Sequence, residues 1–244
     1  MASYAAMYGG FTAGMGFADK YYKGHRRLFK NGRGRGSSTA KRAIVENGST
    51  SILLATRTLY TDPLISVNDT ATNEIDKRQR DMVYVPGSKI CYEFINNLAT
   101  TGSLDTLVVN FAIVKRRCGT TAPNATDFFR SSEATRSVDF GTALSSLEFN
   151  CLPINTDEYI VLMRKKFMLL TKNVNNGSKF QKYINRWVKL AKQYRFKGTD
   201  DTPVCGTPYV VYWVSKMGDS TGTGVEVDQV QLTRRIVTYF REPK

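Results

Sequence analysis

The heptapeptide KICYEFI at residues 89–95 alternates apolar and polar side chains, and this alternation decides the class of the fold. In an extended chain it places Ile90, Tyr92 and Phe94 on one face and the polar residues on the other. Such a pattern is typical of a β-strand that buries one face. Residues 89–95 therefore predict a half-buried strand.

Neighbouring stretches extend the pattern in both directions. Residues 104–117 carry apolar side chains at alternate positions from Leu107 to Ile113, and a Thr-Gly turn separates them from residues 89–95. We therefore predict that these two strands form a hairpin. Before them, residues 82–85 form a strand, and Pro86-Gly87 indicates a turn.

Further β-branched and aromatic runs predict strands at 51–60, 159–170, 209–214 and 229–240. The weakly patterned region between them predicts a short helix at 127–131 and a strand at 146–151. Six or seven firm strands with long loops at 61–80 and 119–157 indicate an all-β sandwich or jelly roll in one domain.

One segment has the periodicity of a helix and not that of a strand. Between Phe180 and Tyr194 the apolar side chains recur at helical spacing, with basic residues elsewhere on the helical wheel. By periodicity alone, this segment predicts a basic amphipathic helix.

The net charge of +14 on 244 residues is concentrated near the N-terminus. A Gly-rich stretch without carboxylates carries nine cations: Lys20, Lys23, Arg26, Arg27, Lys30, Arg33, Arg35, Lys41 and Arg42. A flexible basic arm suits a polyanion, and no apolar helical face accompanies it to favour a membrane surface. We therefore predict that these nine residues bind nucleic acid, with Tyr21, Tyr22 and Phe29 available to stack on bases.

Three basic clusters lie in the predicted β-body. They are Lys115, Arg116 and Arg117; Arg164, Lys165 and Lys166; and the cations of residues 182–197. Two interpretations of these clusters remain open. In the first, they line an inner surface that binds nucleic acid; in the second, they cap the ends of strands.

The chemistry-bearing residues are too few for an enzyme. The single histidine, His25, lies in the basic arm, and the four cysteines are scattered without a CxxC pair. The sequence therefore predicts free thiols and no catalytic residues, metal site or cofactor. It contains no apolar run of about 18 residues, so no membrane insertion is predicted.

The order of these segments resembles a known family, the single-jelly-roll capsid proteins of small circular Rep-encoding single-stranded DNA viruses, the circovirus-like group. The resemblance is carried by a basic arm that leads into NGSTSILLATRTLY, then KICYEFINN, LDTLVVNFAIVKRR, NTDEYIVLMRKKFMLL and the terminal QLTRRIVTYFREPK. It covers roughly residues 40–244 and is a similarity of pattern and order.

The resemblance implies an eight-stranded antiparallel jelly roll at 46–244 after a basic arm at 1–45, and it makes residues 182–196 a strand. It implies about sixty copies in an icosahedral shell around a single-stranded DNA genome, with the long loops at subunit contacts and on the outer surface. It also implies a virion protein that visits the host nucleus, for which Arg26-Arg27 and Lys41-Arg42 suit a localisation signal.

Other functions remain open at this point. The chain would also suit a non-capsid viral protein that binds single-stranded nucleic acid, including a movement protein. A coat protein of a small RNA virus is a further alternative, because backbone phosphates are the same in both polymers. The sequence indicates no host receptor.

Overall fold

The computed structural model describes residues 41–45, 52–67, 77–96, 106–119, 121–130, 144–171, 179–217 and 230–242. In these ranges the protein is all-β, with nine strands in two antiparallel sheets and one short helix. The elements are β1 (Lys41–Val45), β2 (Ile52–Leu54), β3 (Tyr60–Pro63), β4 (Met82–Asn96), β5 (Leu107–Arg116), α2 (Ser146–Cys151), β6 (Tyr159–Leu169), β7 (Gln181–Arg195), β8 (Pro208–Lys216) and β9 (Val230–Arg241).

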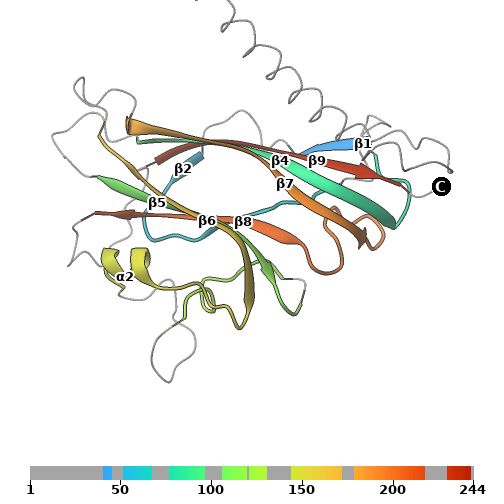
Figure 1. Cartoon of the computed structure of the whole chain (residues 1–244), viewed down its shortest axis with the longest axis horizontal. Helices are drawn as coiled ribbons and strands as arrows, with labels where there is room; N and C mark the ends of the chain where they lie inside the picture. Colours follow the sequence, from blue (N-terminus) through green and yellow to red (C-terminus); the bar gives the residue numbers. More distant parts are fainter. Residues whose placement is uncertain are drawn as a thin grey trace, which may run out of the picture. The chain divides into compact units, whose positions relative to one another are not determined.

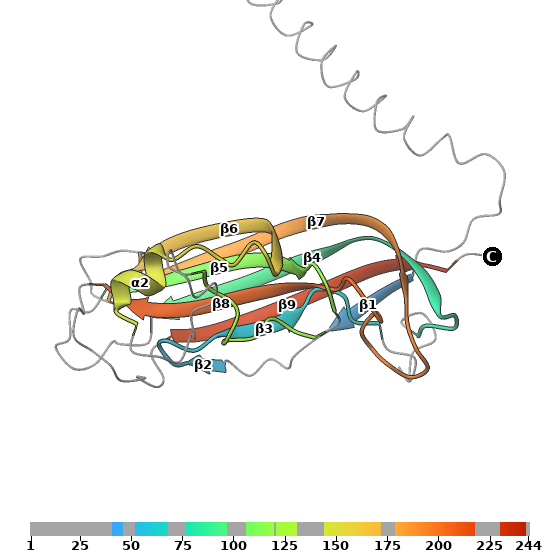
Figure 2. The ribbon, with the colours of Figure 1, turned by 90° about the horizontal axis from the view of Figure 1, so that it is seen from below.

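The strands of the first half of the chain pair with those of the second half in nested order. In the sheet that we call the β4 sheet, β1 and β2 pair with successive parts of β9, β9 pairs with β4, and β4 pairs with β7. In the second sheet, the β5 sheet, the order is β3-β8-β5-β6, as Figure 2 shows from below. The first and last strands are therefore neighbours.

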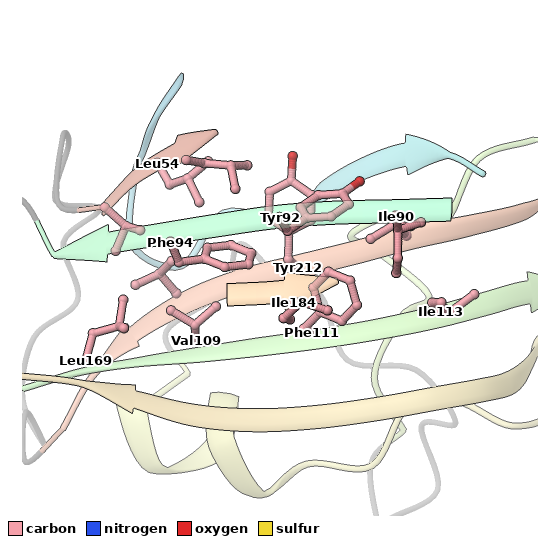
Figure 3. Packing of buried hydrophobic residues seen from close by; sticks show 14 of the residues in the cluster. Leu54, Ile90, Tyr92, Phe94, Val109, Phe111, Ile113, Leu169, Ile184 and Tyr212 are labelled. Carbon is pink, nitrogen blue, oxygen red and sulfur yellow. The ribbon is translucent and has the colours of Figure 1, made fainter. Parts of the chain in front are cut away.

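The main core lies between the two sheets. Tyr92 and Phe94 of β4 point toward Phe111 of β5 and Tyr212 of β8 (Figure 3), with ring centroids 5.3 Å apart for Tyr92 and Phe111. All four side chains are fully buried, and each contributes roughly 1.5 to 3 kcal/mol by leaving water. The half-buried strand predicted at 89–95 is confirmed, as is the shared face from Leu107 to Ile113.

A second core covers the outer face of the β5 sheet, so that β5 and β8 are buried on both faces. Trp213 of β8 lies at its centre, where its indole N–H donates to the carbonyl of Phe149 in α2 at 3.0 Å. Figure 1 shows α2 below this sheet and the β4 sheet above it. This double burial explains why β8 reads as a continuous apolar run.

The predicted hairpin between 89–95 and 104–117 is wrong. β4 pairs with β7 and β9, whereas β5 pairs with β6 and β8 in the other sheet. The predicted turn at Pro86-Gly87 is also wrong, because β4 runs unbroken through it with a bulge between Val85 and Gly87. A bulge leaves backbone groups outside the ladder, so proline is tolerated there.

The strand predicted at 51–60 divides between the sheets. Residues 52–54 form β2 and residues 60–63 form β3, and Arg57 between them has a φ of 56°. The left-handed backbone at this position turns the chain from the β4 sheet into the β5 sheet. The strands predicted at 159–170, 209–214 and 229–240 are confirmed as β6, β8 and β9.

The strand predicted at 146–151 is the helix α2. Ser145 accepts a hydrogen bond from the backbone N–H of Glu148, whose carboxylate accepts one from the backbone N–H of Ser145. This capping box starts the helix. The backbone hydrogen bond is also the main reason why the pKa of Glu148 is lowered. The helix predicted at 127–131 is wrong for the described residues, because 127–130 contain a turn and a bridge between Phe129 and Ile154.

The amphipathic helix that periodicity predicts at 180–194 is wrong, and the strand that the resemblance implies is confirmed. β7 pairs with β4 along nearly its whole length. Its edge position leaves most side chains exposed, so the burial pattern has no strict period of two. Tertiary pairing outweighs local periodicity here.

Candidate nucleic-acid interface

Two cations predicted in the arm belong to the β-body. Lys41 and Arg42 lie in β1, opposite Phe240 and Tyr239 of β9 in the strand register. β1 is an edge strand, so the chain enters the β4 sheet along β9. The other predicted arm residues lie outside the described ranges: Lys20, Lys23, Arg26, Arg27, Lys30, Arg33 and Arg35.

The cluster at the end of β5 is engaged by nearby groups. Arg116 pairs with Asp127, with Nη2 2.6 Å from Oδ2, and lies 3.7 Å from Glu158. Arg117 donates from Nε to the carbonyl oxygen of Thr156 at 2.8 Å. Two carboxylates offset the charge of Arg116, which makes it a weaker partner for phosphate than an isolated arginine. This geometry favours the interpretation in which the cluster caps the end of β5.

A tyrosine completes this contact. Tyr159 lies beneath the guanidinium of Arg116 and donates its hydroxyl hydrogen to Asp127. Burial raises the pKa of Tyr159, and the hydrogen bond to Asp127 raises it further, so the phenol stays neutral. The group as a whole joins β5, β6 and residues 121–130. Lys115, the third member of the cluster, lies beside Gly206, where an added Cβ would stand 3.1 Å from its Cε.

The cluster on β6 is divided between two faces. Lys165 opposes Phe111, so it lies on the face of β6 that is turned toward the main core, whereas Arg164 and Lys166 lie on the outer face. Arg164 donates to the carbonyl oxygen of Leu152 at 3.4 Å, and partial burial lowers the pKa of its guanidinium. The three residues therefore do not form one binding surface.

The β4 sheet carries the strongest accumulation of positive charge in the described strands. β7 contains five cations without a carboxylate, and β9 contains three arginines without a carboxylate. The cations predicted at 182–197 are all exposed: Lys182, Arg186, Lys189, Lys192, Arg195 and Lys197. These cations are therefore accessible to an anionic polymer.

Sequence reasoning missed two cations on this sheet, Lys89 and Arg235. Both are exposed and lie on the outer face, because their strand neighbours Ile90 and Ile236 are buried in the main core. The alternation in residues 89–95 contained the signal for Lys89. For Arg235 the signal was the Arg-Arg pair in β9. Successive side chains of a strand point to opposite faces, so one arginine of the pair must face inward and the other outward.

The inward member, Arg234, holds the sheets together. It pairs with Asp62 of β3 and donates to the hydroxyl of Tyr212 at 2.6 Å, while Tyr92 donates to Asp62 at 2.9 Å. Burial alone would lower the pKa of Arg234, but the electrostatic attraction of Tyr212, Asp62 and Tyr92 raises it. This network lies inside the sandwich and serves structure rather than ligand binding.

Other kinds of site find little support in the part of the chain that the structure describes. No group of three His, Cys, Asp or Glu residues there is placed to hold a metal ion. The four cysteines are free thiols, as predicted. No helix of the described residues is long and apolar enough to cross a membrane.

No family model matches this chain, and a search of curated proteins found no match either.

Proposed function

We propose that this protein is a viral capsid subunit that assembles into a closed icosahedral shell and packages single-stranded DNA. The observation that supports this most is the nested strand pairing, with β9 beside β1 and β2 and two facing sheets of order β1/β2-β9-β4-β7 and β3-β8-β5-β6. A long antiparallel hairpin rolled into two sheets gives this order, and we infer that the fold is a jelly roll. Viral capsids are a principal use of that architecture.

The number of strand positions agrees with this proposal. β1 and β2 occupy successive parts of one edge of β9, so the nine strands fill eight positions, four in each sheet. The basic arm supplies the second component of the proposal. It carries seven cations before β1, and β1 itself adds Lys41 and Arg42, on a subunit whose sheets provide a rigid body. Neutralising the phosphates of an enclosed genome releases counterions and thereby couples packaging to assembly.

The proposal is tested first by the mass of the purified full chain. About sixty copies of the 27.4-kDa chain give a closed particle of roughly 1.6 MDa, which light scattering and electron microscopy detect. A stable species of one or two chains at all concentrations would contradict it and favour a non-capsid nucleic-acid-binding or movement protein. Sensitivity of the nucleic acid extracted from the particles to DNase or to RNase separates a DNA virus from an RNA virus.

A variant of the arm tests the role of the cations. Replacing the seven cations before β1, Lys20 to Arg35, with Gln leaves the strand β1 intact. We expect particles or subunits with a folded β-body and little nucleic acid, measured by the ratio of absorbance at 260 and 280 nm. The matched control replaces Arg116 and Arg117, which contact protein groups, and keeps its nucleic acid. Unchanged nucleic-acid content in the arm variant would contradict the packaging role.

A further inference from the structure

Large aromatic side chains lie on the outer face of the β4 sheet. Tyr183 and Trp187 of β7 are 62% and 51% exposed. They are four residues apart on one strand, so they share a face at a spacing of about 13 Å. Their register partners Glu93 and Lys89 alternate with buried core residues of β4, which places the two aromatic residues on the face turned away from the core.

A glycine of β4, Gly87, leaves room for the indole ring of Trp187 to pack against the sheet. The ring of Trp187 meets the ring of Tyr239 of β9 with their centroids 5.1 Å apart, although β4 runs between their strands. Gly87 lies at this crossing, where an added Cβ would stand 2.6 Å from Cζ2 of Trp187 and 2.4 Å from the carbonyl oxygen of Val188. The indole therefore lies against the sheet in a fixed position, with half of its surface open to solvent.

Cations surround these rings. Lys89 opposes Trp187 directly, Lys189 opposes Gly87, and Arg235 opposes Cys91 one step further along the same face. Among the residues that β4, β7 and β9 direct to this face, Glu93 is the single carboxylate. The face therefore combines an aromatic surface with excess positive charge.

We propose that the outer face of the β4 sheet binds single-stranded nucleic acid by stacking unpaired bases on Trp187 and Tyr183. The neighbouring cations contact the phosphates that flank those bases. Aromatic side chains stack on bases of any sequence, and a basic groove or face follows the backbone. Duplex nucleic acid offers no free base faces, so this surface distinguishes single strands from double strands, which the arm cations do not.

β1, which follows the basic residues in the sequence, belongs to the same sheet as this face. Arg42 of β1 opposes Tyr239 in the strand register, so β1, the first described strand after the basic residues, lies at the edge of the same sheet. This inference rests on the proposed function for its ligand, because the packaging of a single-stranded genome supplies unpaired bases.

Tryptophan fluorescence of the full chain tests the proposal. The protein has two tryptophans, and Trp213 is fully buried, so a bound base quenches the emission of Trp187 alone. Protein stripped of nucleic acid is titrated with a short oligo(dT), an abasic strand of equal length, and a duplex, while anisotropy of labelled strands reports binding. We expect saturable quenching with oligo(dT) only, and its loss in Trp187→Phe.

Affinity gives a second measure. Stacking contributes about 1 to 3 kcal/mol per base, so Trp187→Ala should weaken the binding of oligo(dT) at least about fivefold and leave the abasic strand unaffected. The control is Met168→Ala, which removes a side chain of similar exposure, 56%, from β6 of the other sheet and leaves both affinities unchanged. Thermal unfolding of each variant verifies that it is folded.

The outcomes separate this inference from the proposed function. Binding of oligo(dT) without quenching, or equal quenching by the abasic strand or the duplex, overturns the stacking surface and leaves packaging by the arm intact. An absence of both binding and particles overturns both proposals. Shielding of Trp187 from acrylamide in particles free of nucleic acid would assign this face to a subunit contact and overturn the inference.

Discussion

The two sheets of this protein are built from similar strands but face different surroundings. In the β5 sheet, β5 and β8 are buried on both faces, between the main core and the layer formed by α2 and residues 121–130. In the β4 sheet, β4 and β9 are buried on one face, and the other face of the sheet carries exposed cations and aromatic residues. Together with the proposed function, this difference implies a division of roles, in which the second core of the β5 sheet adds stability and the open face of the β4 sheet is the proposed binding surface.

The largest expected effect comes from the two tryptophans. Trp213 in the β5 sheet is fully buried and makes edge contacts with Phe128 and Phe129, so Trp213→Ala should cost about 3 to 5 kcal/mol of unfolding free energy. Trp187→Ala in the β4 sheet should cost about 1 kcal/mol or less, because half of the side chain is already exposed. Urea unfolding measures both values. Equal losses would refute the division of roles.

The buried ion pair between the sheets should give the next largest effect. Asp62→Ala leaves the guanidinium of Arg234 without its carboxylate inside the sandwich, which should destabilise the fold by about 3 kcal/mol. The double variant Asp62→Ala and Arg234→Met removes both charges and should recover part of the loss. Failure of the second substitution to recover any stability would show that the packing of Asp62, rather than its charge, matters.

A smaller effect is expected at Gly87, against which Trp187 packs. Gly87→Ala places a methyl group against the backbone carbonyl of Val188 as well as the indole, so relief requires movement of the strand. We expect a loss of about 1 to 3 kcal/mol together with a changed emission of Trp187. The combination Gly87→Ala and Trp187→Ala tests the cause, since it should restore little stability if the contact with Val188 dominates.

The smallest effect concerns alkaline pH. Burial raises the pKa of Tyr92 and of Tyr212, so the folded protein retains these protons where the unfolded chain, with tyrosine pKa values of about 10, loses them. Stability should therefore be constant with respect to these groups below pH 10 and fall as the pH rises above it. Urea midpoints between pH 9 and pH 11 measure the fall. It should lessen in Tyr92→Phe combined with Tyr212→Phe, and remain in the exposed control Tyr183→Phe.

Strands with at least one buried face were predicted more accurately from the sequence than the exposed edge strand β7. Residues 89–95 and 229–240 were predictable because a strand with one buried face alternates, and the apolar run at 209–214 indicated a strand buried on both faces. β7 at the edge of the β4 sheet gave no such signal, because exposure on both faces removes the alternation. Its apolar residues then matched a helical spacing by coincidence.

The candidate site was predictable in composition but not in arrangement. Runs of lysine and arginine are visible in any sequence, so the clusters at 115–117 and 164–166 attracted attention. The structure divides the second cluster between two faces and gives Arg116 carboxylate partners from residues 127 and 158. The contact between the exposed Trp187 and the half-buried Tyr239 was not predictable, since the two residues lie 52 positions apart and meet only through Gly87.

The sequence by itself determined the β class, the faces of the alternating strands and the concentration of charge before residue 43, because these depend on side-chain order along the chain. Only the tertiary structure decided which strands pair, that residues 52–54 and 60–63 belong to opposite sheets, and which cations remain open to solvent. Strand pairing and exposure depend on partners distant in the sequence. The same alternation of apolar and polar residues is compatible with many different strand pairings, so the local pattern does not select among them.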